Sequence, residues 1–254
     1  MFVCLAFCSC ASLQEKLQEL SEAISASFSA DDDGPDAPAQ GTDKRSGADD
    51  AHWDIAALDT ARGADYLSGV EKDVILEMNK VRTNPSKYAE LYIKPRLKYF
   101  FGTNYSVPGK ITIATKEGKK AVEECIAALS RARPAAALLP ERGLARAAKD
   151  HAADQGPKGA TGHGGSDRSS PAARISRYGK MGNTMGENIS YGDNSGREIV
   201  CSLLIDDGVP NRGHRTNIMN KTFSQCGTGF GRHKAYRSMC VIVYAHGYTS
   251  AAAE

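Results

Sequence analysis

The sequence predicts an α/β fold in which helices cover both faces of a small, mostly antiparallel sheet. Apolar residues recur at helical spacing through most of the folded region. Two strand segments then close the chain, at 226–231 and 238–245. The second of these is rich in β-branched residues and almost continuously apolar, which is typical of a central strand buried on both faces.

Four helices are predicted from apolar stripes. The first begins at a capping box formed by Ser68 and Glu71, and it ends before Asn84-Pro85. The other three are expected at 116–131, 140–155 and 197–206. Between the first two helices, residues 99–109 are expected to form a loop and residues 110–113 a short strand.

The N-terminal part of the chain differs in composition from the rest. Residues 1–11 form a short apolar run, interpreted as a signal or lipoprotein segment with a possible lipid anchor at Cys10. Residues 12–29 have the apolar spacing of an amphipathic helix. Residues 30–66, rich in Asp, Gly, Pro and Ala, are predicted to be a disordered linker. The folded domain is therefore expected over 67–250.

The overall composition limits the classes of function. The 254 residues are 41% hydrophobic and 24% charged, which fits one globular domain with additional sequence. The net charge is only +2, and no basic block occurs, which argues against a protein dedicated to nucleic-acid binding. No stretch of the sequence is apolar for long enough to predict a transmembrane span.

Four cysteines lie in the predicted domain: Cys125, Cys201, Cys226 and Cys240. Export of the protein would permit disulfides. Cys226 and Cys240 flank a predicted turn at 232–236, so they could face each other across adjacent strands. Alternatively, all four cysteines are free buried thiols, and the sequence leaves both possibilities open.

Two histidines lie in glycine-rich turns, with a Gly-Glu-Asn triplet between them in the sequence. These motifs are Thr161–Gly165, Gly186–Ile189 and Gly213–Ile218. They contribute His163, Glu187 and His214. Two imidazoles and a carboxylate suit a divalent metal such as zinc, provided that the fold brings the three side chains together.

From about residue 68 to 248 the chain resembles the CAP superfamily (cysteine-rich secretory proteins, antigen 5 and pathogenesis-related 1) in its compact bacterial form. The matching segments, in order, are Asn79–Arg82 with Asn84-Pro85, Leu144–Ala152, Gly162-His163, Gly186–Ile189, Gly213–Met219 and Gly227–Gly231. Their order carries the resemblance. It implies a three-layer α-β-α sandwich in which His163, His214 and Glu187 line a central cleft.

A fourth group in that cleft is suggested by the same resemblance. Larger eukaryotic members of the superfamily carry a second glutamate on the helix before the second histidine. Here that helix ends in Asp206-Asp207-Gly208. Either Asp206 or Asp207 is one helical step from the buried face and is a candidate fourth group. The same residues also fit an ordinary helix-terminating turn.

These observations predict an exported protein, secreted or anchored in a bacterial cell envelope. The favoured function is a non-enzymatic binding module whose site takes a divalent metal, zinc in particular, together with a small ligand or surface partner. The alternative is a metal-assisted hydrolase in which Glu187 is the general base towards a metal-bound water. A third possibility is a tethered domain that only presents a surface.

Overall fold

The computed structural model describes residues 51–251. The predicted signal or lipoprotein segment at 1–11, the amphipathic helix at 12–29 and the linker up to residue 50 lie outside the described residues. Within 51–251, no helix combines the length and the apolar character needed to cross a bilayer.

Residues 51–66, which the sequence analysis assigned to the linker, pack on the domain in the structure. Helix α3 (Ile55–Leu58) lies in this segment, and both Leu58 and Ala61 are buried. Trp53 donates from Nε1 to the hydroxyl of Tyr92 at 2.9 Å. A few apolar side chains are therefore enough to hold the segment on the domain, although its average composition is polar.

A four-stranded sheet forms the centre of the domain, with strand order β4-β7-β8-β6. Its strands are β4 (Leu139–Pro140), β6 (Thr184–Tyr191), β7 (Gln225–His233) and β8 (Arg237–His246). Strand β8 is central, as predicted, and it pairs antiparallel with both β6 and β7. Only the short β4 pairs in parallel, with β7. Two small antiparallel sheets accompany it: β1 (Phe100–Phe101), β2 (Asn104–Tyr105) and β3 (Ile113–Ala114), and β5 (Gly179–Lys180) with β9 (Thr249–Ser250).

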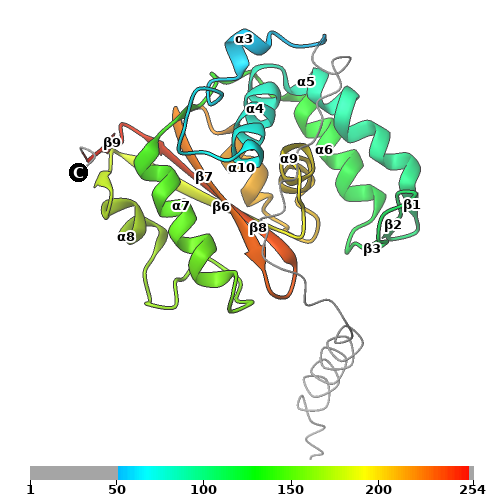
Figure 1. Ribbon diagram of the computed structural model, residues 1–254. Helices are drawn as coiled ribbons and strands as arrows, with labels where there is room; N and C mark the ends of the chain where they lie inside the picture. Colours follow the sequence, from blue (N-terminus) through cyan, green and yellow to red (C-terminus); the bar gives the residue numbers. More distant parts are fainter. Residues whose placement is uncertain (1–50, 252–254) are drawn as a thin grey trace, which may run out of the picture. The chain divides into compact units, whose positions relative to one another are not determined.

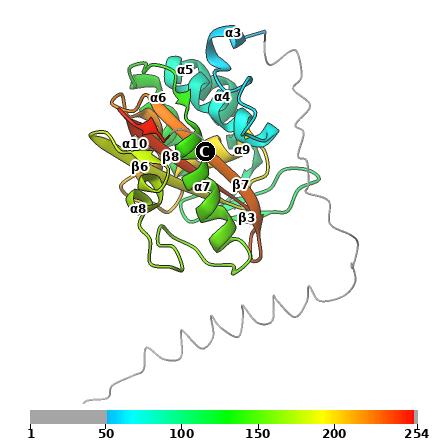
Figure 2. The ribbon, with the colours of Figure 1, turned by 60° about the vertical axis from the view of Figure 1, so that its left-hand side comes forward.

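Helices cover both faces of the central sheet, which gives the predicted three-layer α-β-α sandwich (Figures 1 and 2). One face carries α7 (Arg142–Gln155) and α8 (Pro171–Ser176). The other carries α4 (Gly69–Thr83), α9 (Gly196–Ile205) and α10 (Gly213–Met219). Outside α9 lie α5 (Pro85–Tyr88), the π-helix Ala89–Ile93, the 3₁₀ helix Lys94–Tyr99 and α6 (Lys119–Arg131).

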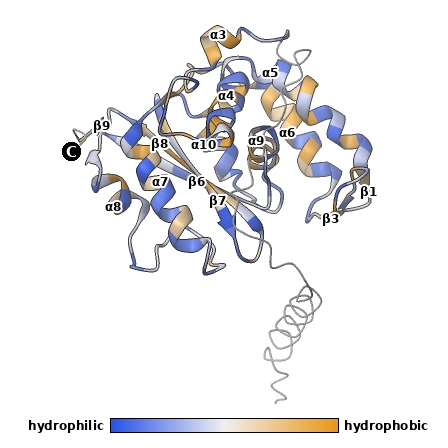
Figure 3. Cartoon of the chain, in the orientation of Figure 1, coloured by the Kyte–Doolittle hydropathy of each residue, from blue (hydrophilic) through white to orange (hydrophobic). Residues whose placement is uncertain are grey.

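Side chains of β8 alternate between two apolar cores, one on each face of the sheet. Val241 and Val243 belong to the core beneath α7, whereas Ile242 and Tyr244 belong to the core shared with α4 and α9. All four are buried. The helices that cover the sheet carry both polar and apolar residues along their length, as expected for amphipathic helices (Figure 3).

Two glycines of β7 allow α7 to lie directly on the sheet. A Cβ atom on Gly227 would lie 2.1 Å from the backbone nitrogen of Ala145. One on Gly229 would lie 2.5 Å from the backbone nitrogen of Lys149. Both distances are far below contact distance, so this part of the Gly-Thr-Gly-Phe-Gly motif serves close helix–strand packing.

The predicted helices are confirmed with shifts of a few residues at their ends. The capping box at the start of α4 is present, with Ser68 N donating to Glu71 Oε2 at 2.7 Å and Glu71 N donating to Ser68 Oγ at 3.4 Å. The region at 99–113 was predicted less well, because β1 and β2 replace the expected loop.

The suggested Cys226–Cys240 disulfide is contradicted by the structure. Cys226 lies opposite Tyr244 in the β7–β8 ladder, and Cys240 lies opposite Phe230. The two cysteines are therefore offset by four residues, about 13 Å along the strands, whereas a disulfide joins Cα atoms less than about 7 Å apart. All four domain cysteines are free and buried. Burial raises the pKa of the Cys226 thiol to about 12.

Candidate functional site

His163 pairs with Glu187 on the α7 side of the sheet. The histidine lies in the loop between α7 and α8, and its Nδ1 is 2.8 Å from Glu187 Oε1. The second carboxylate oxygen of Glu187 accepts from Arg174 Nη2, also at 2.8 Å. The side chains of Glu187 and Arg174 are each only 2% exposed, whereas that of His163 is 54% exposed. The buried Glu187–Arg174 ion pair thus positions the solvent-accessible imidazole of His163.

The loop that carries His163 is fixed by hydrogen bonds on both sides of Gly162. Gly162 N donates to the hydroxyl of Tyr191 at 2.9 Å. Gly162 O accepts from His151 Nε2 at 2.9 Å and from Gln155 Nε2 at 2.8 Å. Gly162 has a φ of +97°, in the left-handed region that favours glycine. The glycine before His163 therefore sets the course of the loop.

The pKa values of the two histidines of this region are shifted in opposite directions. The hydrogen bond to Glu187 raises the pKa of His163 above its usual value, although partial burial opposes the rise. Burial lowers the pKa of His151. His151 must donate from Nε2, because the carbonyl of Gly162 can only accept. His151 is thus a neutral support for the loop, and His163 is the imidazole that gains charge more easily.

His214 pairs with Asp206 on the opposite side of the sheet. Asp206 ends α9 in a left-handed conformation, with φ +57°. Its Oδ1 is 2.6 Å from His214 Nδ1, and its Oδ2 accepts from His214 N at 2.9 Å. The carboxylate therefore orients the imidazole and also satisfies a backbone donor in the first turn of α10. The His214 side chain is 26% exposed, and that of Asp206 is 1% exposed.

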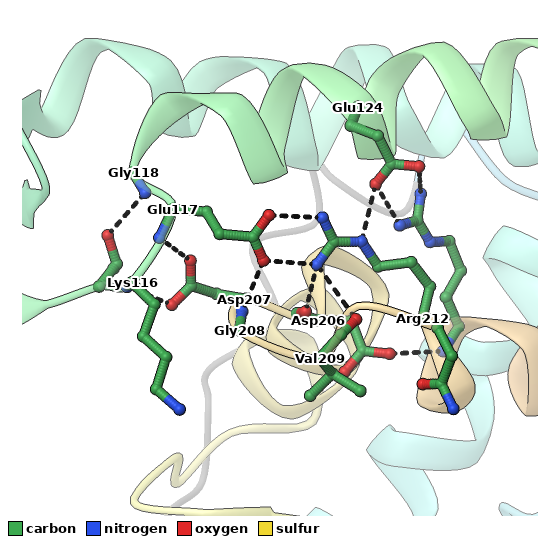
Figure 4. A network of polar contacts seen from close by, with 12 residues as sticks. Lys116, Glu117, Gly118, Glu124, Asp206, Asp207, Gly208, Val209 and Arg212 are labelled. Atoms are coloured by element: carbon green, nitrogen blue, oxygen red, sulfur yellow. Dashed lines mark hydrogen bonds and ion pairs between the residues drawn. The ribbon is translucent and has the colours of Figure 1, made fainter.

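Asp207, the other candidate for the fourth group, lies away from this site. Its carboxylate accepts from Lys116 N at 2.7 Å and from Glu117 N at 2.8 Å, just before α6 (Figure 4). The left-handed conformation of Asp206 turns consecutive side chains towards different elements. Of the two predicted aspartates, Asp206 is therefore the one beside His214.

Arg212 ties the turn between α9 and α10 to the start of α6 (Figure 4). Its Nη1 donates to Asp206 O at 2.8 Å, and its guanidinium forms a two-bonded pair with Glu117, at 2.7 Å for each bond. Its Nε reaches Glu124 Oε2 at 3.1 Å. The hydrogen bond from Arg212 lowers the pKa of Glu117 to about 2, so this pair stays charged at neutral pH. The position of His214 thus depends on a network that reaches α6.

Strand β6, an edge strand of the sheet, is connected to both histidine–carboxylate pairs. Glu187 lies opposite Val243 and faces the core beneath α7, whereas Asn188 lies opposite Ile242 and faces the other core. Asn188 Nδ2 donates to His214 O at 3.0 Å. Adjacent residues of one strand therefore connect the two pairs from opposite faces of the sheet.

The expected grouping of His163, Glu187 and His214 takes another form in the structure, because each imidazole pairs with its own carboxylate. Within residues 51–251, no three His, Cys, Asp or Glu side chains lie together as a metal-binding group. Since Nδ1 of His163 and of His214 faces a carboxylate, Nε2 is the nitrogen left for a ligand. This is how metal-binding histidines are oriented by outer carboxylates. Zinc binding stays a prediction, with two imidazoles as its candidate ligands.

Arg174 is the residue of the site that the sequence analysis missed. It lies on α8, a six-residue helix that was not predicted. Ser170 accepts from Ala173 N, and Pro171 follows at the first helical position, which together are a recognisable helix start. That signal would have located the helix. A single buried arginine leaves no periodic pattern that would identify its partner Glu187.

Comparison with known proteins gives the same assignment as the motifs. The model of the cysteine-rich secretory protein family, CAP, matches residues 77–244. An outer surface protein from Borrelia burgdorferi is similar at 19% identity and a TM-score of 0.37, over 43% of this chain and 77% of that one. An extracellular protein containing an SCP domain, from Bacillus anthracis str. Ames, is similar at 20% identity and a TM-score of 0.36, over 44% of this chain and 34% of that one. Comparison with curated proteins gives no match.

Proposed function

The chain belongs to the cysteine-rich secretory protein (CAP) family, and we propose that its domain is a non-enzymatic binding module whose ligand contacts are His163 and His214. The observation that supports this proposal is the pairing of each imidazole Nδ1 with a buried carboxylate, at 2.8 Å and 2.6 Å. Such pairing fixes the orientation of each ring and increases the basicity of Nε2. Both imidazoles remain partly exposed.

Zinc is the proposed metal ligand of this module. Imidazole nitrogen is a preferred zinc donor, and a site with few protein ligands leaves coordination positions open for a small ligand. Glu187 and Asp206 are proposed to orient the histidines rather than to bind the ion. Both oxygens of Glu187 already accept hydrogen bonds, and both oxygens of Asp206 also accept hydrogen bonds. Because only two protein donors are available, we expect weak binding.

Calorimetric titration of the protein with zinc tests this proposal. We expect uptake by the wild-type protein and weaker uptake in both His163→Ala and His214→Ala, because each substitution removes one of the two imidazole donors. His246→Ala is the matched control, since His246 is an exposed histidine outside both pairs. Absence of uptake by the wild-type protein, or uptake unchanged in both site variants, would contradict zinc binding.

A metal-assisted hydrolase is the second candidate, with Glu187 as general base. The position of Glu187 beside an accessible histidine favours it. However, a base must be free to accept a proton, and the Glu187 carboxylate is buried and paired with Arg174. We therefore expect no turnover of peptide or ester substrates by the zinc-loaded protein. Turnover that disappears in Glu187→Gln, with zinc affinity retained, would establish the hydrolase instead.

The proposal places this module outside the cytoplasm, secreted or anchored in a bacterial cell envelope. It rests on the apolar run that leads to Cys10. Fractionation of cells that express the full chain, followed by mass spectrometry of the N-terminal peptide, tests it. A lipid-modified Cys10 in the envelope fraction is expected, with release into the medium in Cys10→Ser. Full-length protein confined to the cytoplasm would contradict export.

A further inference from the structure

Exposed apolar side chains gather in one small part of the domain. Six large hydrophobic side chains are exposed in the described residues, and three of them lie within the small sheet β1–β3 and its connections. These are Phe101, 86% exposed, Ile111, 67% exposed, and Ile113, 54% exposed. Such a concentration of apolar side chains usually marks an interaction site.

The small sheet is too thin to cover these side chains by itself. Each of its strands has two residues, and Phe101 pairs with Asn104 beside the Gly102–Thr103 turn. Ile113 pairs with Tyr105 and so faces the other side from Phe101. The small sheet therefore presents one exposed apolar side chain on each of its faces, and Ile111 adds another in the connection between β2 and β3, a shape suited to partial insertion into an apolar layer.

The same segment is strongly basic, in contrast to the balanced charge of the whole chain. Between residues 94 and 120 there are seven basic residues and one acidic residue, Glu117. Glu117 is already paired with Arg212. Lys94 and Lys110 also have acidic partners, Glu90 and Glu198. The segment thus carries a local excess of positive charge that its own acidic groups do not neutralise.

Four lysines around the small sheet have no ion pair within residues 51–251: Lys98, Lys116, Lys119 and Lys120. All four are exposed. The side chain of Lys98 lies over the aromatic ring of Tyr99, with its Nζ 4.9 Å from the ring centroid. Lys119 and Lys120 begin α6, whose first turn lies next to β3 (Figure 1). These four lysines and the three exposed apolar residues are called the β1–β3 surface.

We propose that the β1–β3 surface docks on an anionic lipid bilayer. Lysines near an anionic leaflet are attracted to its headgroups, and exposed phenylalanine and isoleucine side chains enter the boundary with the acyl chains. A hydrated polyanion, such as an acidic polysaccharide, would neutralise the lysines but leave Phe101 and Ile111 in water. The combination of charge and apolar exposure therefore favours a lipid surface, and it is independent of the histidine site.

Binding of the full chain to vesicles tests this proposal. Vesicles that contain phosphatidylglycerol are compared with vesicles of phosphatidylcholine alone, and the bound fraction is measured by sedimentation. We expect binding only to the anionic vesicles, weakening as salt rises. Phe101→Ser is expected to weaken it about tenfold or more, and Lys98→Gln and Lys119→Gln about fivefold each. The matched controls are Leu139→Ser and Lys234→Gln, which change an exposed apolar residue and an exposed lysine elsewhere.

A local probe separates this surface from any contribution of residues 1–50. In Phe101→Trp, fluorescence quenching by phosphatidylglycerol with brominated acyl chains is expected beyond that of the wild-type protein, whose single tryptophan is Trp53. Three results would overturn the proposal: binding without quenching of the new tryptophan, equal binding to both kinds of vesicle, or equal loss of binding in the control variants. Binding to heparin with no binding to anionic vesicles would assign the surface to a polyanion instead.

Discussion

The two histidine sites reach the same local geometry with different supports. At His163 the carboxylate is held by a buried guanidinium, that of Arg174. At His214 the carboxylate is held by backbone N–H groups at the start of α10, including His214 N at 2.9 Å. Orienting an imidazole thus needs a fixed carboxylate but no particular means of fixing it. The first support is a buried charge pair and the second is a helix terminus, so their loss should have different energetic costs.

The largest effect is expected when the guanidinium is removed from the first site. Arg174→Ala removes the buried guanidinium that pairs with Glu187, a change that typically lowers the free energy of unfolding by about 3–5 kcal/mol. Urea denaturation measures this loss. Arg177→Ala is the control, because Arg177 is on the same segment but its ion pairs are exposed to solvent, and its unfolding midpoint should hardly change. Equal midpoints for the two variants would show that the buried pair does not support the first site.

A smaller effect is expected at the second site. Asp206→Ala removes the acceptor for His214 N and places alanine at φ +57°, which together should lower the free energy of unfolding by about 2 kcal/mol. Asp206→Asn keeps an acceptor oxygen and a residue type that tolerates the left-handed region, so it should lose much less. Denaturation of both variants checks the difference. Should asparagine be as destabilising as alanine, charge rather than geometry would hold this site.

The smallest effect concerns pH at the first site. The pKa of His163 is raised in the folded state, so its contribution to stability is fully present below the unfolded value near 6.5 and is lost as pH rises through the folded pKa. The pKa of His151 is lowered in the folded state. Its contribution to stability is therefore fully present above the unfolded value near 6.5 and is lost as pH falls through the folded pKa. NMR titration of the imidazole Cε1–H signals should find His163 above 6.5 and His151 below it. Glu187→Gln should lower the pKa of His163, and an unchanged value would show that the carboxylate does not set it.

Much of the fold could be predicted because its larger elements carry periodic apolar patterns. Helices α4, α6, α7 and α9 have such stripes, and β8 is continuously apolar. The short helices α8 and α10 could not be predicted from periodicity, because six or seven residues contain too few apolar positions. Helices of this length are stabilised mainly by tertiary contacts. Ile175 and Ile218 supply those contacts, each fully buried in a core that the local sequence does not reveal.

Four residues that the sequence analysis named take part in the two histidine–carboxylate pairs, although their role as a binding site stays a prediction and their arrangement differs from the expected one. His163, Glu187, His214 and Asp206 all lie in one of the two pairs. The sequence could not decide between Asp206 and Asp207, because the choice depends on a single left-handed φ angle. Nor could it show that the two pairs lie on opposite faces of β6, since that depends on the register of this strand against β8. Glu187 was therefore expected between the histidines, although it serves only one of them.

The adjacency of Glu187 and Asn188 makes strand β6 intolerant of insertions and deletions. A shift of one residue would place either Asn188 opposite Arg174 and Ile189 beside the hydroxyl of Tyr244, or Gly186 opposite Arg174 and Glu187 beside that hydroxyl, which now accepts from Asn188 Nδ2 at 3.1 Å. Such a shift would remove the Glu187–Arg174 ion pair on one face of the sheet and the Asn188–Tyr244 hydrogen bond on the other. Length changes in homologous chains should therefore occur outside 184–191, even where the sequence of the neighbouring loops diverges.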